Sequence, residues 1–205
     1  MRILVLGATG KTGLHVVSQA LVGGHSVTAF VRDASKLNIT DPHLKVAVGD
    51  ARNAKDVAKA LSGQDAVIST LGSNEVGSDL ILASTKVLIE AMHKKDVKRI
   101  IMMSSFLASP HSRQSLIFRI GSWLAKPIVV DKLSGEEILK RSDLDWTIVY
   151  ATRLDGARPG KYHVLAEGEK VGANAAIART DVATLMLALA DDKKSSQKSL
   201  IVTAS

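Results

Sequence analysis

The 205-residue chain contains no cysteine, only 4 prolines and few aromatic residues. The lack of cysteine excludes a disulfide framework, a thiolate metal site and a cysteine nucleophile. Because aromatic residues make up only 3% of the chain, few side chains are present for nucleic-acid bases to stack on. No apolar run approaches the ~20 residues that a membrane-spanning helix needs. We therefore expect a cytoplasmic protein that binds neither nucleic acid nor a membrane.

The basic residues outnumber the acidic ones by 27 to 20, which gives a formal net charge of +7. They are spread along the chain in short groups such as Lys94–Lys95 and Lys193–Lys194. This distribution favours a solvated basic surface with a site for an anionic ligand over a nucleic-acid interface. The six histidines are scattered, with no pair four residues apart, so no metal site is expected.

The segment GATGKTG at residues 7–13 is similar to two kinds of phosphate-binding loop. The P-loop of an NTPase has a glycine five positions before its Gly-Lys-Thr, and Val5 occupies that position here. A dinucleotide loop instead has spaced glycines directly between a strand and a helix. Residues 2–6 are a short apolar run typical of a strand buried on both faces, and residues 11–22 have helical periodicity. This context predicts a dinucleotide loop.

Each glycine of the loop has an expected role. Gly7 makes the tight turn, Gly10 lets the backbone approach the pyrophosphate, and Gly13 lets the helix lie close to the strand. Lys11 and Thr12 contribute mainly backbone N–H groups at the helix N-terminus. The loop residues predicted to contact the dinucleotide are Gly7, Thr9, Gly10, Lys11, Thr12 and Gly13.

The second predicted strand, residues 26–31, is followed by Arg32 and Asp33. An acidic residue at this point binds the ribose 2′-OH of NAD, whereas an arginine accommodates the 2′-phosphate of NADP. Arg32 lies 19 residues after Gly13, and its planar guanidinium suits a phosphate, with Lys36 nearby. Asp33 could instead pair with Arg32 or turn toward a ribose. The chemistry favours NADP(H) over NAD(H).

Strands and helices alternate along the rest of the chain. This order predicts an α/β fold, a Rossmann-type doubly wound and mostly parallel sheet with helices on both faces. Further strands are predicted at 44–48, 66–70, 99–104, 146–150 and 199–203, and helices at 54–61, 80–93, 133–141 and 180–190. The helix at 80–93 has Leu80, Ala83, Val87 and Ala91 on one face, and the pattern loosens over residues 105–130, which contain Pro110 and Pro127. Residues 155–173 are expected to be irregular, and Thr180 is expected to be a helix N-cap. We expect one domain, 1–205, with a small substrate or lid region around 105–130 and 151–178.

Ligands of such sheets bind beyond the carboxyl ends of the strands. Arg32, Asp50, residues 70–72, residues 104–105 and Arg153 all follow predicted strands or end them. We therefore expect these residues to line one edge of the sheet.

Several stretches in this order resemble the atypical short-chain dehydrogenase/reductase superfamily, in the branch of NmrA-like proteins and biliverdin-IXβ reductase/flavin reductase. They are GATGKTG, VTAFVRDASKL, VAVGDARNAKDVAKALSGQDAVISTLG, VKRIIMMSS, LKRSDLDWTIVYATRL and IARTDVA. The resemblance implies that Asp50 and Ala51 contact the adenine. It also implies that Thr70, Leu71 and Gly72 flank the adenosine and pyrophosphate.

The same resemblance implies roles near the nicotinamide. Ser104 and Ser105 would lie by the nicotinamide ribose and ring, with Ser105 beside the substrate. The segment YATRL, which contains Arg153, would close over the nicotinamide, and Arg153 stands where flavin reductase has a histidine. We predict Ser105 and Arg153 as catalytic residues, because one can donate a hydrogen bond and the other can stabilise negative charge. Lys132 is a weaker candidate for this role and is expected to be a solvated lysine at a helix start.

The Tyr-x-x-x-Lys pair of typical short-chain dehydrogenases is absent, because Tyr150 and Tyr162 are followed four residues later by Leu154 and Ala166. Its absence disfavours an alcohol dehydrogenase, an epimerase or a dehydratase. Reduction of a planar acceptor depends less on a positioned acid, because the charge delocalises. We therefore predict an NADPH-dependent reductase of a flavin (FMN or FAD), a quinone or a biliverdin-like acceptor.

The alternative is a non-catalytic NADP(H)-binding redox sensor of the NmrA type, which would regulate a protein partner. The segment SLIFRIGSWLA, residues 115–125, fits both hypotheses as a substrate lid or a partner surface, and it could equally be a helix packed on the core.

Overall fold

The computed structural model describes residues 1–72, 78–114, 123, 126–154, 158–166 and 169–205. The β-strands are β1 (Arg2–Leu6), β2 (Ser26–Val31), β3 (Leu44–Val48), β4 (Ala66–Ser69), β5 (Arg99–Ser105), β6 (Asp145–Ala151), β7 (Tyr162–Val164) and β8 (Lys198–Ala204). The α-helices are α1 (Lys11–Val22), α2 (Ala54–Ala60), α3 (Leu80–Lys95), α5 (Lys126–Lys140) and α6 (Arg179–Asp191).

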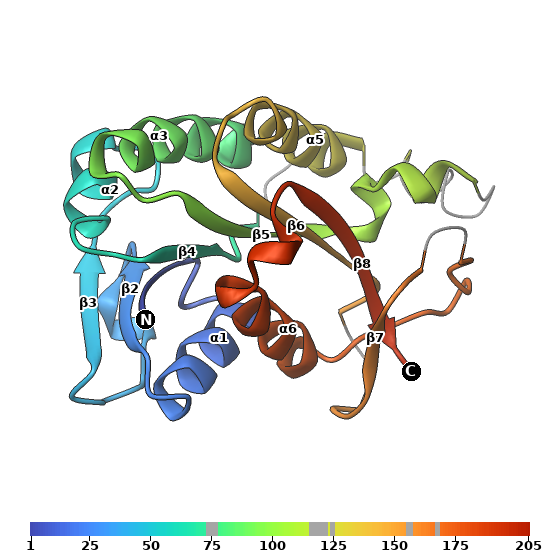
Figure 1. The fold of residues 1–205 in the computed structure, drawn as a ribbon, viewed down its shortest axis with the longest axis horizontal. Helices are drawn as coiled ribbons and strands as arrows, with labels where there is room; N and C mark the ends of the chain where they lie inside the picture. The colour runs from blue at the N-terminus through green and yellow to red at the C-terminus, as the bar shows by residue number, and fades with distance from the viewer. Residues whose placement is uncertain (73–77, 115–122, 124–125, 155–157, 167–168) are drawn as a thin grey trace.

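The strands form one sheet in the order β3-β2-β1-β4-β5-β6-β8-β7 (Figure 1). Every pair of neighbours is parallel except β7 and β8, which are antiparallel. From β1 the chain builds outward first through β2 and β3, and then in the other direction through β4, β5 and β6. The predicted Rossmann-type, doubly wound sheet is therefore confirmed, and β1 and β4 flank its topological switch point.

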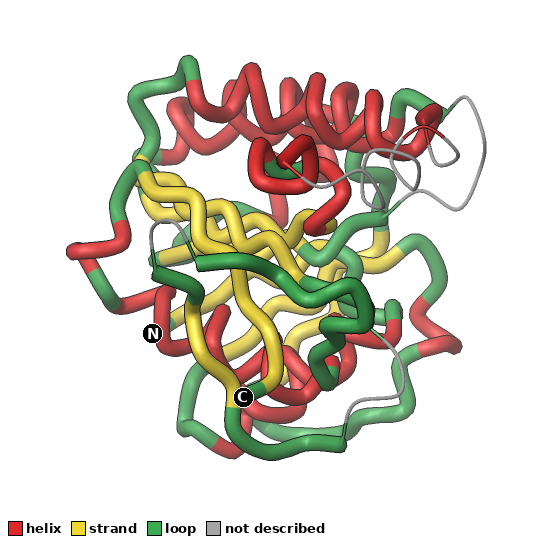
Figure 2. Tube along the Cα trace, turned by 90° about the vertical axis from the view of Figure 1, so that its right-hand side faces the viewer, coloured by secondary structure: helices red, strands yellow, loops and turns green. Residues whose placement is uncertain are grey.

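Helices cover both faces of the sheet, with α1 and α6 on one side and α2, α3 and α5 on the other (Figures 1 and 2). The alternating side chains of β1 explain why the whole strand is apolar. Leu4 and Leu6 pack into the core under α2, α3 and α5, whereas Ile3 and Val5 pack into the core against α1 and α6. The prediction that this strand is buried on both faces is confirmed.

The strand ends are not level at the carboxyl edge of the sheet. Ser69, the last residue of β4, pairs with Met102 of β5, and β5 continues for three more residues. Ser105 at its end pairs with Ala151 at the end of β6. The ends of β5 and β6 therefore extend beyond the end of β4. Ser104 and Ser105 lie further out at the carboxyl edge than the last residue of β4.

Helix α5 begins at Lys126, seven residues earlier than the start predicted at residue 133. Pro127 suggested a break in the sequence, but it lies in the first turn of the helix. A proline is tolerated there because the first N–H groups of a helix have no intrahelical acceptor. The earlier start makes Lys132 a mid-helix residue.

Three other local predictions are wrong. The buried face of α3 is Ile81, Ser84, Thr85, Leu88, Ala91 and Met92. Of the expected stripe of Leu80, Ala83, Val87 and Ala91, only Ala91 is fully buried. This helix packs against both α2 and α5, so its neighbours decide which side is covered. The N-cap of α6 is Ala178, and Thr180 lies inside the helix. The stretch 155–173, expected to be irregular, contains β7, which pairs with β8.

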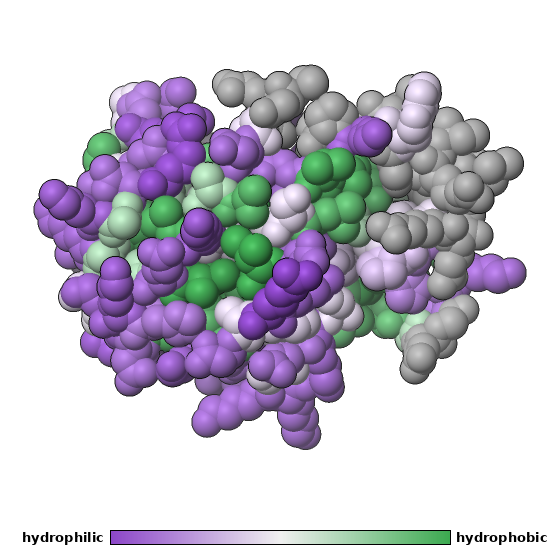
Figure 3. Space-filling view, turned by 90° about the horizontal axis from the view of Figure 1, so that it is seen from above, coloured by the Kyte–Doolittle hydropathy of each residue, from purple (hydrophilic) through white to green (hydrophobic). Residues whose placement is uncertain are grey.

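The outer face over α2, α3 and α5 is polar around its margins, with hydrophobic residues exposed across its middle (Figure 3). Most of segment 115–125, proposed from the sequence as a lid or partner surface, lies outside the described residues; Trp123 is described and is 70% exposed. Among the described residues, no helix is both long enough and apolar enough to cross a membrane.

Candidate functional site

The glycine loop between β1 and α1 has the geometry that its sequence predicts. Gly7 has a φ of +77°, in the left-handed region that favours glycine. A Cβ atom on Gly13 would lie 2.1 Å from the carbonyl oxygen of Gly7. Gly7 therefore turns the chain, and Gly13 allows the first turn of α1 to lie directly against the loop.

The N-terminus of α1 is open to an anion. Its N-cap is Gly10, which provides no side-chain cap, and its first turn holds no acidic residue. Within the described chain, the backbone N–H groups of Lys11, Thr12 and Gly13 donate to no protein acceptor. These N–H groups and the positive end of the helix dipole form a cradle for phosphate.

A cavity of about 330 Å³ lies beside this loop, and we call it the glycine-loop cavity. Its lining residues are Gly7, Thr9, Gly10, Phe30, Val31, Arg32, Lys36, Gly49, Asp50, Ala51, Arg52, Thr70, Leu71, Gly72 and Leu80. Ten residues that the sequence analysis assigned to cofactor binding are among them. Lys11, Thr12 and Gly13 begin α1 next to the cavity but do not line it. The assignment of all these residues to a cofactor stays a prediction.

Thr70 joins the end of β4 to the glycine loop. Its hydroxyl Oγ1 lies 3.1 Å from the carbonyl oxygen of Leu6 and 3.2 Å from that of Gly7. The same oxygen would be 2.9 Å from a Cβ atom on Gly7 or Gly13. Thr70 thus packs tightly against the loop and hydrogen-bonds its first carbonyl.

Arg32 is exposed at the end of β2 and does not pair with its neighbour Asp33. The Asp33 carboxylate instead accepts hydrogen bonds from the backbone N–H and the hydroxyl of Ser35, at 3.0 and 2.7 Å. Lys36 lies 3.9 Å from Asp33 on the same turn. No hydrogen bond or ion pair of Arg32 occurs within the described residues, so its guanidinium is available to a ligand. The alternative of an Arg32–Asp33 pair is wrong.

Asp50, after β3, is held by Arg52, a residue that the sequence analysis did not single out. Its carboxylate accepts from the backbone N–H of Arg52 at 2.9 Å and from the guanidinium at 2.9 and 3.2 Å. These hydrogen bonds lower the pKa of Asp50 to about 2, and the charges of Arg52 and Arg32 add to the effect. Asp50 is therefore anionic at any working pH, and Arg52 brings a third cation to the cavity.

A second cavity, of about 410 Å³, lies at the extended ends of β5 and β6, and we call it the β5–β6 cavity. Its lining residues are Ser104, Ser105, Phe106, Leu107, Lys132, Ala151, Thr152, Arg153, Leu154, Val171, Ala173 and Ala175. The two residues predicted as catalytic, Ser105 and Arg153, thus line one cavity. Ser104 and Arg153, also predicted to bind cofactor, line this cavity and not the glycine-loop cavity.

The backbone at Arg153 ties the far wall of this cavity to the sheet. Its N–H donates to Ala175 at 3.3 Å, and its carbonyl accepts from Ile177 at 2.9 Å. Residues 171–175 are thereby held over the cavity. Ser105 caps the turn that follows β5, because its Oγ accepts from the backbone N–H of Leu107 at 3.3 Å.

Lys132 is the residue whose position the sequence predicted wrongly, although it was a weaker candidate for the site. It was expected to be a solvated lysine, but it is half-buried on α5 and lines the β5–β6 cavity. Burial lowers the pKa of its amine, while the charges of Glu136 and Asp131 act in the opposite direction. The sequence could have indicated the position of Lys132 only through the earlier start of α5. That start places Lys132 one turn before Glu136 on a packed helix. Elsewhere in the described chain, no three His, Asp or Glu side chains cluster as a metal site would require.

Comparison with known proteins identifies the family of the chain. The family described as NAD(P)H-binding matches residues 7–193 of the chain. An uncharacterized chloroplastic protein of Arabidopsis thaliana is 28% identical over 216 residues, covering 99% of this chain and 76% of the relative. The photosystem II assembly factor Ycf39 of Synechocystis is 26% identical over 169 residues, covering 80% of this chain but only 48% of that protein.

Solved structures share the fold over nearly the whole chain. An anaerobillin reductase from Escherichia coli O157:H7 is 25% identical with a TM-score of 0.82, covering 98% of this chain and 96% of that one. An oxidoreductase from Lactococcus lactis has a TM-score of 0.84 at 22% identity, covering 100% and 91% of the two chains, and it supports the fold alone. The resemblance found in the sequence motifs is confirmed. The chain belongs to the NAD(P)H-binding oxidoreductases of the atypical short-chain dehydrogenase/reductase superfamily, in the NmrA-like and biliverdin reductase-like branch.

Proposed function

We propose that this protein is an NADPH-dependent reductase that passes hydride to a planar acceptor such as a flavin, a quinone or a biliverdin-like molecule. The observation that supports this most is the pair of cavities at one edge of the sheet. The glycine-loop cavity combines an open helix N-terminus with Arg32, Lys36 and Arg52. The β5–β6 cavity is largely apolar, but Ser105, Lys132 and Arg153 lie in its wall.

The residues fit a dinucleotide in the following way. The N–H groups at the start of α1 hold the pyrophosphate, and Arg32 with Lys36 binds the 2′-phosphate. Asp50 and Ala51 contact the adenine, Thr70 to Gly72 flank the adenosine, and Ser104 lies toward the nicotinamide end. A nicotinamide cofactor bound there supplies the hydride. The regions around 105–130 and 151–178 are proposed as the acceptor-binding part of the single domain.

The β5–β6 cavity supplies charge and a proton to the acceptor. Lys132 and Arg153 stabilise negative charge on a reduced acceptor, in a cavity whose apolar walls strengthen the interaction. The Ser105 hydroxyl donates a hydrogen bond to it. The Lys132 ammonium is also a proton donor within reach of a ligand, a role that the sequence left without a candidate.

The direct test is rapid mixing of the protein and NADPH with FMN, a quinone or biliverdin, followed at 340 nm under single-turnover conditions. We expect oxidation of NADPH with at least one of these acceptors. No oxidation with any of them, while NADPH binding is retained, would overturn the reductase proposal.

Lys132→Gln is expected to slow that oxidation by about 100-fold, within the ~10²–10⁴ range of a positioned proton donor. Because burial lowers the pKa of Lys132, the ammonium is lost at lower pH than in a free lysine. The wild-type rate should therefore fall as the pH rises through that lowered pKa, and the fall should be missing in Lys132→Gln. Lys126→Gln, an exposed residue at the start of the same helix, is the control. An identical pH profile in wild type and Lys132→Gln would contradict the role.

Arg32→Ala is expected to weaken NADP⁺ binding by roughly 10- to 100-fold, the worth of charge-assisted hydrogen bonds to phosphate. NAD⁺ has no 2′-phosphate, so its affinity should change less than threefold, which isothermal titration can measure for both dinucleotides. Lys45→Ala, an exposed cation on β3, should leave both affinities unchanged. Equal losses for NADP⁺ and NAD⁺ would reject the 2′-phosphate assignment.

The similarity to Ycf39, a photosystem II assembly factor by name, favours one second candidate. In that case the chain is a non-catalytic NADP(H)-binding sensor that regulates a protein partner. NADPH binding without turnover of any acceptor is the result that would favour it over the reductase.

A further inference from the structure

Four polar side chains from three elements form a chain of hydrogen bonds behind the β5–β6 cavity. This chain of hydrogen bonds is buried at Ser104, Glu136 and Tyr150 and exposed at Lys140. Glu136 on α5 is 1% exposed. One of its carboxylate oxygens lies 2.5 Å from Oγ of Ser104, and the other lies 2.5 Å from the hydroxyl oxygen of Tyr150 on β6. Lys140, one turn further along α5, lies 3.1 Å from the Tyr150 hydroxyl and 3.8 Å from Glu136.

The ammonium group at one end decides how the Tyr150 hydroxyl takes part in this chain. Lys140 has only protons to donate, so the Tyr150 oxygen must accept. The single proton of Tyr150 is then donated to Glu136. Burial and the Glu136 carboxylate raise the pKa of Tyr150, so the phenol keeps that proton. The short contact from Ser104 to the other carboxylate oxygen has the length of a charge-assisted O–H···O⁻ bond.

The surroundings of Glu136 keep it a hydrogen-bond acceptor. A buried carboxylate is stable only where donors and positive charge compensate for lost hydration. Ser104 and Tyr150 supply the donors, from β5 and β6. Lys140 and Lys132 supply the charge, from positions one turn after and one turn before Glu136 on α5.

The hydrogen bond to Glu136 limits how Ser104 can contact a ligand in the cavity. A serine hydroxyl has one proton, and Glu136 receives the proton of Ser104. Ser104 can therefore meet a ligand only as an acceptor. Ser105 keeps its own proton available for a ligand, because its oxygen accepts from the backbone N–H of Leu107 and no acceptor for the Ser105 proton occurs among the described residues.

We propose that Glu136 is a positioning residue that makes Ser104 an acceptor-only contact, so that the β5–β6 cavity selects a ligand bearing an N–H or O–H donor at that point. Next to the donor Ser105, this pattern matches the edge of a cyclic imide or lactam, where an N–H adjoins a carbonyl. The isoalloxazine ring of a flavin has such an edge at N3. The naming of the acceptor rests on the proposed function, whereas the polarity of Ser104 does not.

The test compares two flavins that differ in this donor. Lumiflavin has an N3–H, and 3-methyllumiflavin has none. Their dissociation constants are measured by flavin fluorescence with the wild-type protein saturated with NADP⁺, so no turnover is needed. We expect the methylated flavin to bind about tenfold more weakly, the worth of ~1.4 kcal/mol for one good hydrogen bond.

Three variants separate hydrogen bonding from fit. Ser104→Ala should weaken the binding of lumiflavin and bring the ratio of the two flavins' dissociation constants close to one. Ser105→Ala should leave this ratio as it is in the wild type. Glu136→Gln leaves the size of the site unchanged. Tyr150 already accepts from Lys140, so the new amide NH₂ faces Ser104 and releases the serine proton toward the cavity. Lumiflavin should then lose affinity while 3-methyllumiflavin does not. A wild-type ratio kept in Glu136→Gln would contradict the role of Glu136.

A cofactor arm identifies the source of the donor. If the flavin ratio is one throughout, but Ser104→Ala and Glu136→Gln each weaken NADP⁺ binding about tenfold, then the donor is on the cofactor and the polarity of Ser104 still holds. If Ser104→Ala and Glu136→Gln change the affinity of neither lumiflavin nor NADP⁺, the inference is overturned. If lumiflavin does not bind at all, the flavin proposal fails, and the NADP⁺ arm alone decides the role of Ser104.

Discussion

Gly13→Ala is expected to lower the affinity for NADP⁺ by more than ~100-fold and to destabilise the protein. An alanine Cβ would lie 2.1 Å from the carbonyl oxygen and 2.8 Å from the carbonyl carbon of Gly7, and 2.9 Å from Oγ1 of Thr70. None of these atoms can move alone, because Gly7 starts the loop and Thr70 is bonded to its carbonyl. Either α1 shifts away from β1 or the loop is distorted, and in both cases the N–H cradle loses its shape.

The cost in stability is about 1–3 kcal/mol, the usual range for overpacking a tight site. It is reduced by the roughly 1 kcal/mol that alanine contributes over glycine inside a helix. Gly160→Ala is a matched control, since a Cβ there meets no atom within 4 Å. Titration with NADP⁺ and urea unfolding measure the two effects. A Gly13→Ala protein that binds NADP⁺ within threefold of wild type would contradict the predicted contact.

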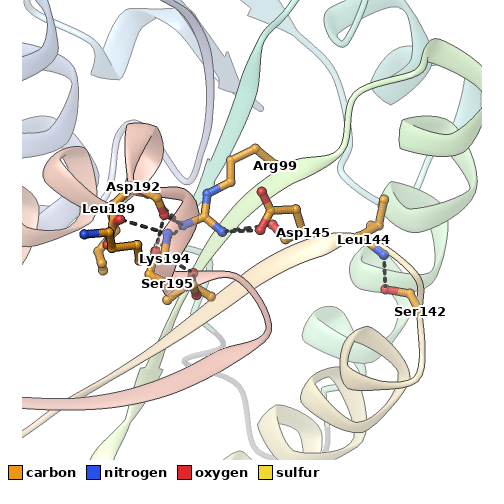
Figure 4. Close-up of polar contacts among 9 residues, drawn as sticks. Arg99, Ser142, Leu144, Asp145, Leu189, Asp192, Lys194 and Ser195 are labelled. Carbon is orange, nitrogen blue, oxygen red and sulfur yellow. Dashed lines mark hydrogen bonds and ion pairs between the residues drawn. The ribbon is translucent and has the colours of Figure 1, made fainter.

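Arg99→Leu is expected to lower the free energy of unfolding by about 3–5 kcal/mol, the cost of removing one partner from a buried polar network. Arg99 is 7% exposed at the start of β5. Its guanidinium donates to the Asp145 carboxylate at 2.9 Å, to the carbonyl oxygen of Leu189 at 2.7 Å and to the Ser195 hydroxyl at 2.7 Å (Figure 4). It therefore joins β5 and β6 to the end of α6 and to the turn before β8.

Leucine would fill part of the space but would leave these acceptors without a donor in a buried site. Burial lowers the pKa of Arg99, but an arginine stays charged at any working pH, so the loss should not depend on pH near neutrality. Arg141→Leu removes an exposed pair with Glu137 on α5 and should cost less than ~1 kcal/mol. Urea unfolding compares the two. A loss for Arg99→Leu as small as that of Arg141→Leu would show that the network does not hold these elements together.

The variants Arg99→Leu and Gly13→Ala should also differ in their effect on the affinity for NADP⁺. Arg99 lies at the amino end of β5, opposite to the edge that holds both cavities. Arg99→Leu that is still folded should therefore bind NADP⁺ with unchanged affinity. The two variants together separate the stability of the sheet from the geometry of the loop.

The glycine loop, the doubly wound parallel sheet and the edge at which the predicted residues gather could be predicted from the sequence because each depends on local patterns. Gly7 is needed for its positive φ and Gly13 for a contact six residues away in the chain. Arg32 follows directly from the end of β2. In each case the residues that interact are close in sequence, or the alternation of strands and helices places them by a general rule.

The sequence also predicted several features wrongly, and each depends on a distant neighbour. Thr180 has the chemistry of an N-cap, but α6 starts one residue before it. The short β7 exists because β8 pairs with it, which no periodicity within residues 155–173 could indicate. The covered face of α3 is chosen by α2 and α5, which a single helical pattern does not contain.

The sequence by itself therefore determined the doubly wound sheet, the turn of the glycine loop and the position of Arg32 after β2. Only the tertiary structure decided the chemistry of the β5–β6 cavity. Lys132 faces it because α5 starts early, and Ser104 has a fixed polarity because Glu136, 32 residues later, accepts its proton. Hydrophobic periodicity specifies which side of an element is buried. It does not specify which polar groups meet there, because those contacts join residues whose distance in the chain bears no relation to their distance in space.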